Sequence, residues 1–213
     1  MKMQKERELI VECGKLLKSS GLCPGTSGNL SICSGDRSML AISPSGMDYD
    51  SLTPEDIVVT DLDANVIDGK RRPSSEWALH TLFYRKRPDI NAVVHTHSLY
   101  CTTFAVLHEP IRAVHFAIAG AGAPEVRCAP YALFGSEELA ETAVNFCGSD
   151  NAVLLANHGI LCCGKDISKA YSLAVDLEYC ARLQYQASCI GTPQFISAGQ
   201  MQDVLRQFRG YGQ

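Results

Sequence analysis

Two histidines separated by one residue, His95 and His97, have the type and spacing that most clearly suggest chemistry in this chain. They follow the largely apolar run 90–94, which predicts a buried strand. Because side chains alternate across a strand, residues two apart point the same way, and both imidazoles can reach one ion. With a third histidine and one carboxylate from elsewhere, the pair would form a zinc site that can exchange a protein ligand for substrate.

The motif Asn157-His158-Gly159 supplies a third imidazole, directly after a predicted strand over 152–156. A lone histidine in such a place is often structural, but the presence of His95 and His97 favours a metal ligand. The remaining histidines lack this setting, and we expect them on helix faces or in loops; they are His80, His108 and His115.

Three short motifs have the composition of anion-binding turns. In Pro73-Ser74-Ser75-Glu76 a loop becomes a helix, with Ser75 as the expected cap and Glu76 in the first turn, where free amides and the helix dipole favour an oxyanion or phosphate. Gly25-Thr26-Ser27-Gly28-Asn29 predicts a backbone-amide nest with Asn29 donating to phosphate oxygens, and Ser43-Pro44-Ser45-Gly46 is of the same kind. Taken singly, each is equally compatible with an ordinary helix start or tight turn.

The elements that must position these residues alternate along the chain with short loops and no repeats. Hydrophobic periodicity predicts helices over 4–19, 76–87, 99–107, 136–147 (capped by Ser136), 167–190 and 198–208. It predicts strands over 28–33, 39–43, 57–61, 92–96, 114–118 and 152–156. Asp68-Gly69 predicts a hairpin turn.

Composition limits the class of protein. A length of 213 residues with 46% hydrophobic and 20% charged residues indicates one α/β domain over 1–213. The net charge of −4 provides no basic field for nucleic acid or an acidic membrane surface, so we expect small-molecule partners. The sequence shows neither a long apolar span nor the apolar core of a signal peptide, which favours a cytoplasmic location.

The 10 cysteines are scattered and include no Cys-x-x-Cys pair. In a cytoplasmic chain of this size we expect most of them to be small buried apolar residues, and we assign none to the site.

Six motifs together resemble the class II aldolase/adducin family, and within it the bacterial aldolases that cleave L-fuculose 1-phosphate. They occur in the family's order over nearly the whole chain, and they are Gly25-Thr26-Ser27-Gly28-Asn29, Ser43-Pro44-Ser45-Gly46, Pro73-Ser74-Ser75-Glu76, Val93-Val94-His95-Thr96-His97, Cys128-Ala129-Pro130-Tyr131 and Asn157-His158-Gly159. The resemblance implies a three-layer αβα fold with a central, largely antiparallel sheet. It also implies a homotetramer with fourfold symmetry whose active sites lie between subunits.

Carried over motif by motif, the resemblance implies one Zn²⁺ per subunit, held by Glu76, His95, His97 and His158. It assigns the substrate phosphate to six residues, Gly28, Asn29, Ser45, Gly46, Ser74 and Ser75. The implied reaction is reversible cleavage of L-fuculose 1-phosphate to dihydroxyacetone phosphate and L-lactaldehyde. In it Glu76 would leave the metal and act as the base at the hydroxymethyl carbon of dihydroxyacetone phosphate, while zinc stabilises the enediolate charge.

The family also places aromatic residues of a neighbouring subunit at the site. Tyr211 matches one such catalytic tyrosine, but Phe116 stands where fuculose phosphate aldolases carry another. Phenylalanine cannot donate a hydrogen bond to the aldehyde oxygen, so Tyr211 or water would have to supply that proton, or the aldehyde product would not be lactaldehyde.

Several alternatives within the family follow from these residues. An aldolase for 5-deoxyribulose or methylthioribulose 1-phosphate would share every motif. An L-ribulose-5-phosphate 4-epimerase is disfavoured because it carries Asp where this chain has Glu76 and uses a further acid in the segment 115–120, which holds no carboxylate. A methylthioribulose-1-phosphate dehydratase is disfavoured by the same segment. A non-catalytic adducin-like role predicts loss of at least one metal ligand, and none is lost.

Overall fold

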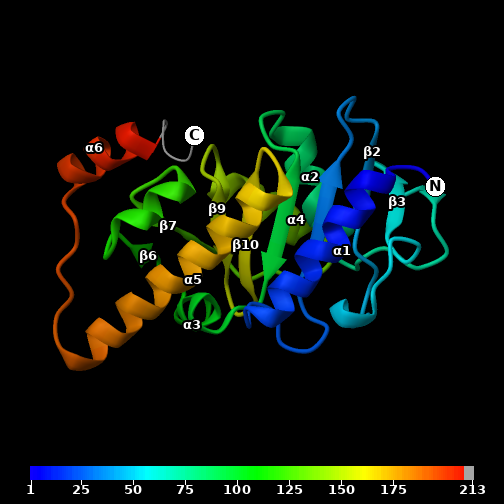
Figure 1. Ribbon diagram of the computed structural model, residues 1–213. Coiled ribbons are helices and arrows are strands. Elements are labelled where there is room, and N and C mark those ends of the chain that lie inside the picture. The colour runs from blue at the N-terminus through cyan, green and yellow to red at the C-terminus, as the bar shows by residue number, and fades with distance from the viewer. Residues whose placement is uncertain (209–213) are drawn as a thin grey trace.

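The computed structural model describes residues 1–208 and, within them, contains an eight-stranded sheet with helices against both faces (Figure 1). The strand order is β4-β3-β2-β1-β5-β10-β9-β8, and all neighbours are antiparallel except β8 and β9. The strands of this sheet are β1 (Asn29–Cys33), β2 (Met39–Ile42), β3 (Val58–Asp61), β4 (Val66–Asp68), β5 (Ala92–Thr96), β8 (Cys128–Ala129), β9 (Ala152–Leu155) and β10 (Gly159–Gly164). Two short strands, β6 (Ile111–Arg112) and β7 (Glu125–Val126), pair separately.

Helices cover the sheet in two layers. One face packs against α1 (Gln4–Ser19), α3 (Leu99–Leu107) and α5 (Ile167–Ile190), and the other against α2 (Trp77–Lys86) and α4 (Glu137–Cys147). Because side chains alternate along a strand, Val94 of β5 enters the first core and Val93 the second. The predicted three-layer αβα fold with a largely antiparallel sheet is therefore confirmed.

Three further elements lie at the edges. The short 3-10 helix η1 (Tyr49–Ser51) contacts α1, and a second one, η2 (Phe116–Ala121), packs on α5. Helix α6 (Ala198–Phe208) follows a long connection from α5 and returns to pack on η2 (Figure 1).

Strand β5 lies in the middle of the sheet and pairs with β1 on one side and β10 on the other. The register places His95 opposite Asn29 of β1 and opposite Leu161 of β10. Antiparallel neighbours run in opposite directions, so the end of β5 lies beside the beginnings of both β1 and β10. Residues just before β1 and β10 therefore meet residues just after β5.

Most of the predicted elements are confirmed. The predicted helices over 4–19, 99–107, 167–190 and 198–208 and the strand over 92–96 have the predicted bounds, and the remaining confirmed elements differ by one or two residues. Ser136 caps α4 as expected, because its Oγ accepts a hydrogen bond from the backbone amide of Leu139 at 3.1 Å. Strand β10 was not predicted, since its sequence Gly-Ile-Leu-Cys-Cys-Gly does not alternate and is too short to distinguish from other buried structure.

The predicted strand over 114–118 is wrong. Strand β6 pairs with β7 over two residues and ends at Arg112, before the predicted strand would begin. The chain then turns into η2, where the ring of His115 accepts a hydrogen bond from the amide of Ala117 at 3.3 Å.

The predicted hairpin turn at Asp68-Gly69 is also wrong. The turn between β3 and β4 comes earlier, where Oδ1 of Asp61 accepts the amides of Asp63 at 2.8 Å and Asn65 at 2.9 Å. This side-chain turn is made by Asp61 itself, and it lets Ala64 adopt a left-handed conformation, with φ of 70°.

The cysteines behave as expected. All ten are free, eight of them are buried, Cys128 is half-buried and Cys189 is exposed. Within residues 1–208 we find no helix that is both long and apolar enough to cross a membrane.

Gly159 provides a test of the packing at the end of β5. A Cβ atom at this position would lie 2.3 Å from the carbonyl oxygen of Thr96, which is backbone and cannot move aside cheaply. We expect Gly159→Ala to lower the free energy of unfolding by about 1–3 kcal/mol, measured by urea denaturation. The control is Gly199→Ala in α6, where no atom lies within 4 Å. That variant should be neutral or more stable by up to about 1 kcal/mol, and equal losses in both variants would contradict the packing argument.

Candidate metal centre

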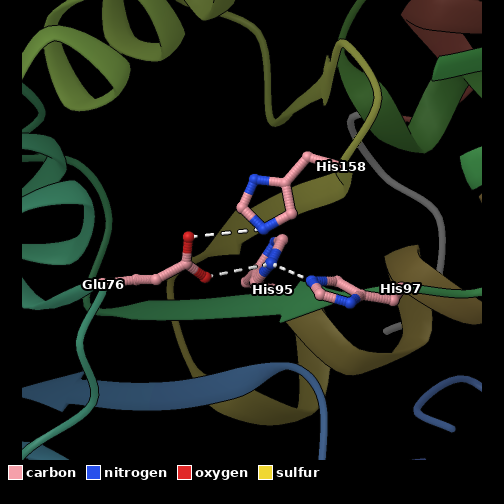
Figure 2. Close-up of side chains that lie close together, drawn as sticks. All are labelled: Glu76, His95, His97 and His158. Atoms are coloured by element: carbon pink, nitrogen blue, oxygen red, sulfur yellow. Dashed lines mark hydrogen bonds and ion pairs between the residues drawn. The ribbon is translucent and has the colours of Figure 1, made fainter. Parts of the chain in front are cut away.

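Four side chains that are far apart in the sequence converge beyond the end of β5, namely Glu76, His95, His97 and His158. Figure 2 shows the three imidazoles and the carboxylate turned toward a common point. The potential ligand atoms all lie within 4.8 Å of one another. Nε2 of His95 is 2.9 Å from Nε2 of His97 and 3.1 Å from Oε2 of Glu76, and Nε2 of His158 is 3.4 Å from Oε1 of Glu76.

The rings are arranged around one position rather than stacked. Each pair of ring centroids is 4.8 or 4.9 Å apart, with interplanar angles of 70–74°. Nδ1 of His95 lies 3.0 Å from the carbonyl oxygen of Ile160, which can only accept, so this nitrogen carries the proton. The lone pair of His95 is therefore on Nε2 and points into the cluster, as in a metal-ligating histidine whose outer nitrogen donates to a carbonyl.

Protonation of this cluster is disfavoured in the folded chain. Burial lowers the pKa of His95 well below its ordinary value, and the neighbouring His158 and His97 lower it further. Burial also lowers the pKa of His97, again assisted by His158. Neutral imidazoles are the form that binds metal ions.

Glu76 has one carboxylate oxygen without a hydrogen-bond donor. Oε2 accepts from Nδ2 of Asn29 at 2.9 Å, whereas Oε1 is buried and accepts no hydrogen bond within the described chain. A buried carboxylate oxygen that lies among three imidazoles and accepts no hydrogen bond is costly unless a cation joins them. The donor set thus fits a divalent metal, and three histidines with one carboxylate are a common set for zinc.

Glu76 reaches the cluster because three loops are tied together by backbone contacts. The end of β2 lies beside the start of β1, where the amide of Leu30 donates to Oγ of Ser43 at 3.1 Å. The amide of Ser74 donates to the carbonyl oxygen of Ser43 at 3.0 Å, and the amide of Ser45 donates to the carbonyl oxygen of Arg72 at 3.1 Å. These bonds hold the start of α2 against the ends of β1 and β2.

The start of α2 differs in detail from the prediction. Glu76, not Ser75, is the residue that caps the helix, so it precedes the first turn instead of lying in it. The amide of Glu76 donates to Oγ of Ser74 at 3.2 Å, and Ser75 is exposed. Ser74 fixes the local turn, which directs the Glu76 side chain toward the histidines.

His158 is positioned by a tight turn between β9 and β10. Asn157 adopts a left-handed conformation with φ of 54°, which asparagine tolerates better than most residues. The amide of His158 donates to the carbonyl oxygen of Leu155 at 3.0 Å, and Gly159 then passes close to the backbone of Thr96. This close passage brings His158 to the end of β5.

A cavity of about 370 Å³ opens beside the cluster and is lined by the three predicted anion-binding motifs. Gly28 and Gly46 have φ of 78° and 68°, which places both turns in the left-handed region. All six residues predicted to bind phosphate line this cavity, and they are Gly28, Asn29, Ser45, Gly46, Ser74 and Ser75. Their contact with phosphate stays a prediction.

Asn29 differs from its expected role because its side-chain amide is already engaged. Nδ2 donates to Glu76, and Oδ1 faces Nε2 of His80 at 2.5 Å. His80 lies on a face of α2, within the expected setting of a helix face or a loop, but that face is buried and the ring is joined to the site through Asn29. Its position four residues after Glu76 on one helix face was the sequence signal that could have identified it.

Two aromatic residues that the sequence did not assign to the site also line the cavity, Tyr131 and Phe134. Both are largely exposed, and Gly135 directly after them packs against the backbone of Ser75. The motif Cys128-Ala129-Pro130-Tyr131 was the available signal for this loop. The described lining residues include neither lysine nor arginine, so an anion here would be held by amides, hydroxyls and the metal centre.

Two predicted positions lie away from the cavity or outside the described chain. Phe116 is 48% exposed on η2, where its ring contacts those of His115 and Phe208. It does not line the cavity formed by residues 1–208. Tyr211 lies outside the described residues.

Comparison with known proteins places these features in context. Residues 8–185 match the family described as Class II Aldolase and Adducin N-terminal domain. A 5-deoxy-D-ribulose 1-phosphate aldolase of Bacillus thuringiensis serovar kurstaki is 48% identical over 213 residues, covering 100% of both chains. An L-fuculose phosphate aldolase of Haemophilus influenzae is 38% identical over 207 residues, 97% of this chain and 94% of the relative. A solved structure of L-fuculose 1-phosphate aldolase superposes with a TM-score of 0.95 at 38% identity, covering 98% of each chain.

Acidification should destabilise the metal-free protein. Burial lowers the pKa of His80 from 6.5 to about 4, and the pKa values of His95 and His97 shift in the same direction. Below the unfolded pKa the unfolded chain therefore binds more protons than the folded chain, so stability is greatest above about pH 6.5 and falls as the pH approaches about 4. His80 alone corresponds to a loss of about 3 kcal/mol across this window.

Urea denaturation of metal-free protein at several pH values measures this loss. The comparison is His80→Gln, which lacks the buried imidazole and should lose the share of the pH dependence that comes from His80. A free energy of unfolding that stays constant as the pH falls through the window would contradict the shifted pKa values.

Proposed function

Because the chain belongs to the class II aldolase and adducin family, we propose that it cleaves 5-deoxyribulose 1-phosphate to dihydroxyacetone phosphate and acetaldehyde. That it is a class II aldolase follows from the family and from relatives aligned along the entire chain. The observation that carries the proposal is the cluster of one carboxylate and three imidazoles beside a cavity lined by glycine and serine turns.

The proposed reaction breaks the bond between carbons 3 and 4 of the ketose 1-phosphate. The hydroxyl on carbon 4 gives its proton to water or to Tyr211 and becomes the aldehyde oxygen, while the bonding electrons remain on carbon 3 as an enediolate. Glu76 in its protonated form gives its proton to carbon 3, which yields dihydroxyacetone phosphate. The proton released from the carbon 4 hydroxyl then returns to the carboxylate through solvent, so the protons balance over one turnover. In the reverse direction the same carboxylate removes that proton, and Glu76 is the only carboxylate among the described residues that line the cavity.

We assign the metal-binding role to Glu76, His95, His97 and His158, and we propose Zn²⁺ as the metal. A divalent cation bound there would supply the Lewis acidity that a carboxylate base needs to remove a proton from so weak a carbon acid. The glycine and serine turns would hold the phosphate. With the phosphate held there, the sugar would extend along the cavity toward Glu76 and the histidines. The donors in these turns are uncharged amides and hydroxyls. We expect such donors to bind phosphate less tightly than lysine or arginine would, so dihydroxyacetone phosphate can leave after the reaction.

The choice of sugar rests on sequence identity. Identity to the 5-deoxyribulose 1-phosphate aldolase is 48%, compared with 38% to a fuculose phosphate aldolase of similar coverage. By the resemblance, Phe116 stands where fuculose phosphate aldolases carry a tyrosine; it lies outside the cavity formed by residues 1–208, so it would reach the aldehyde from a neighbouring subunit.

L-fuculose 1-phosphate, the substrate expected from the motifs, is the second candidate. The observation in its favour is the close superposition on a solved L-fuculose 1-phosphate aldolase.

We also propose a homotetramer with the active sites between subunits. The exposed apolar side chains of Leu99, Val106 and Leu107 on α3 support contact with another subunit, since monomeric proteins seldom leave such residues grouped on one helix. Tyr211 remains a proposed catalytic residue that would approach a site in such an assembly.

A panel of ketose 1-phosphates tests the substrate. The purified protein, loaded with zinc, is given 5-deoxyribulose, methylthioribulose, L-fuculose and L-rhamnulose 1-phosphates, and release of dihydroxyacetone phosphate is followed with a coupled reductase. We expect the highest kcat/KM with 5-deoxyribulose 1-phosphate. A higher value with L-fuculose 1-phosphate would select the second candidate, and release from none of the esters would contradict the aldolase assignment.

Glu76→Gln tests the base. An amide cannot accept the proton, so exchange of the hydroxymethyl hydrogen of dihydroxyacetone phosphate with solvent should fall by about 10²–10⁴-fold, followed by NMR in D₂O. Some zinc should remain bound through the three histidines. The control Glu141→Gln makes the same change at an exposed position of α4 and should exchange at the wild-type rate. Exchange retained in Glu76→Gln would assign the base elsewhere.

A further inference from the structure

A chain of buried polar side chains leads from the core face of α2 to Glu76. Oη of Tyr84 lies 2.7 Å from Oγ of Ser31, and that Oγ lies 2.6 Å from Nδ1 of His80. Nε2 of His80 lies 2.5 Å from Oδ1 of Asn29, whose Nδ2 donates to Oε2 of Glu76 at 2.9 Å. All five residues are buried, with exposed fractions of 6% or less.

The carboxylate at the end of this chain determines the direction of the hydrogen bonds from Ser31 to Glu76. An ionised carboxylate only accepts, so Asn29 must present its NH₂ group to Glu76 and its carbonyl oxygen to His80. Nε2 of His80 must then carry a proton. A neutral imidazole has only one, so Nδ1 of His80 accepts the hydroxyl proton of Ser31.

The far end of the chain follows from the same counting. Since the hydroxyl proton of Ser31 goes to His80, Oγ of Ser31 can only accept from the phenol of Tyr84. The single phenol proton is shared between this Oγ and the carbonyl oxygen of Ser31, which lies 2.9 Å away and can only accept. From Ser31 onward the donors point toward Glu76, and aligned hydrogen bonds of this kind polarise one another.

His80 and Glu76 together hold the Asn29 amide in one orientation. An asparagine amide can rotate by half a turn and exchange its oxygen and nitrogen. If His80 offered no donor, the Asn29 oxygen would lose its partner at Nε2, and only the repulsion between two acceptors would keep that oxygen away from the Glu76 carboxylate. Burial lowers the pKa of His80 to about 4, which keeps the imidazole in its neutral form.

We propose that His80 is a positioning residue for Glu76, acting through the amide of Asn29. The proposal rests on the proposed function, in which Glu76 serves as both metal ligand and base and must therefore keep a defined orientation. Partners that orient metal ligands in this way typically change metal affinity or activity by about 10–100-fold when they are removed.

The protonation state of His80 tests the geometry directly. In protein labelled with ¹⁵N-histidine, long-range ¹H–¹⁵N NMR spectra distinguish which ring nitrogen carries the proton, and the spectrum of His80→Gln assigns the signals. We expect a neutral ring protonated at Nε2 near neutral pH, in both metal-free and metal-loaded protein. A ring protonated at Nδ1, or an imidazolium, would overturn the proposal. This measurement needs only the wild-type fold to be intact.

Two substitutions at position 80 separate a donor from mere filling of space. In His80→Gln the side-chain amide can still donate toward Asn29, whereas His80→Leu offers no donor. We expect His80→Leu to lower zinc affinity by about 10–100-fold in competition with a chelator, and to lower kcat for proton exchange more than it raises KM for dihydroxyacetone phosphate. His80→Gln should recover most of both losses.

Thr81→Val is the matched control. Thr81 is the next residue of α2 and is also buried, but within residues 1–208 its hydroxyl donates only to the carbonyl oxygens of Trp77 and Ala78. Zinc affinity in this variant should equal that of the wild type. Equal losses in His80→Gln and His80→Leu, or the same loss in Thr81→Val, would show that the effect is only structural and would overturn the proposal.

The failure of the proposed function is distinguishable from the failure of this inference. If the wild-type protein cleaved none of the sugar phosphates, the proposed function would fail, while the ring protonation and the zinc affinities would still decide the role of His80. If the wild type were active and His80→Leu bound zinc and exchanged protons normally, only the inference would fail.

Discussion

The antiparallel pairing of β5 with both β1 and β10 is the constraint on which the site depends. The end of β5 carries His95 and His97, and only antiparallel neighbours place the starts of β1 and β10 beside that end. Parallel neighbours would bring their starts to the opposite edge of the sheet. The same ladder of hydrogen bonds that stabilises the centre of the sheet thus brings Asn29 opposite His95 and carries His158 to the cluster.

Close approach of backbones completes this convergence. A Cβ at Gly28 would lie 2.7 Å from the carbonyl oxygen of His95, and one at Gly159 would lie 2.3 Å from that of Thr96. The turns before β1 and β10 can therefore press against the end of β5 only because these two residues lack side chains. Helix α2 is joined to the same edge through Ser43 and Ser74, so the carboxylate arrives from a different layer of the fold.

Electrostatics explain how so polar a cluster is accommodated in a buried position. Burial keeps His95 and His97 neutral by lowering their pKa, one carboxylate oxygen of Glu76 accepts from the amide of Asn29, and the other is left for a cation. Positive charge at the site would come from that cation, since the described lining of the cavity has no lysine or arginine. The hydrogen bonds from Ser31 through His80 and Asn29 continue this arrangement into the core, and each of them has a defined direction.

The sequence by itself determined those features that depend only on residues close together along the chain. Periodicity identified β5 and most helices, the spacing of His95 and His97 indicated a shared ion, and the ordered motifs indicated the family. Tertiary structure alone decided that Asn29 bonds to Glu76 across 47 residues, that His80 is buried behind them, that β10 flanks β5, and that 116–121 coils instead of extending. The physical reason is that strand order and register join segments distant in sequence, whereas hydrophobic periodicity reports only which face of a single segment is buried.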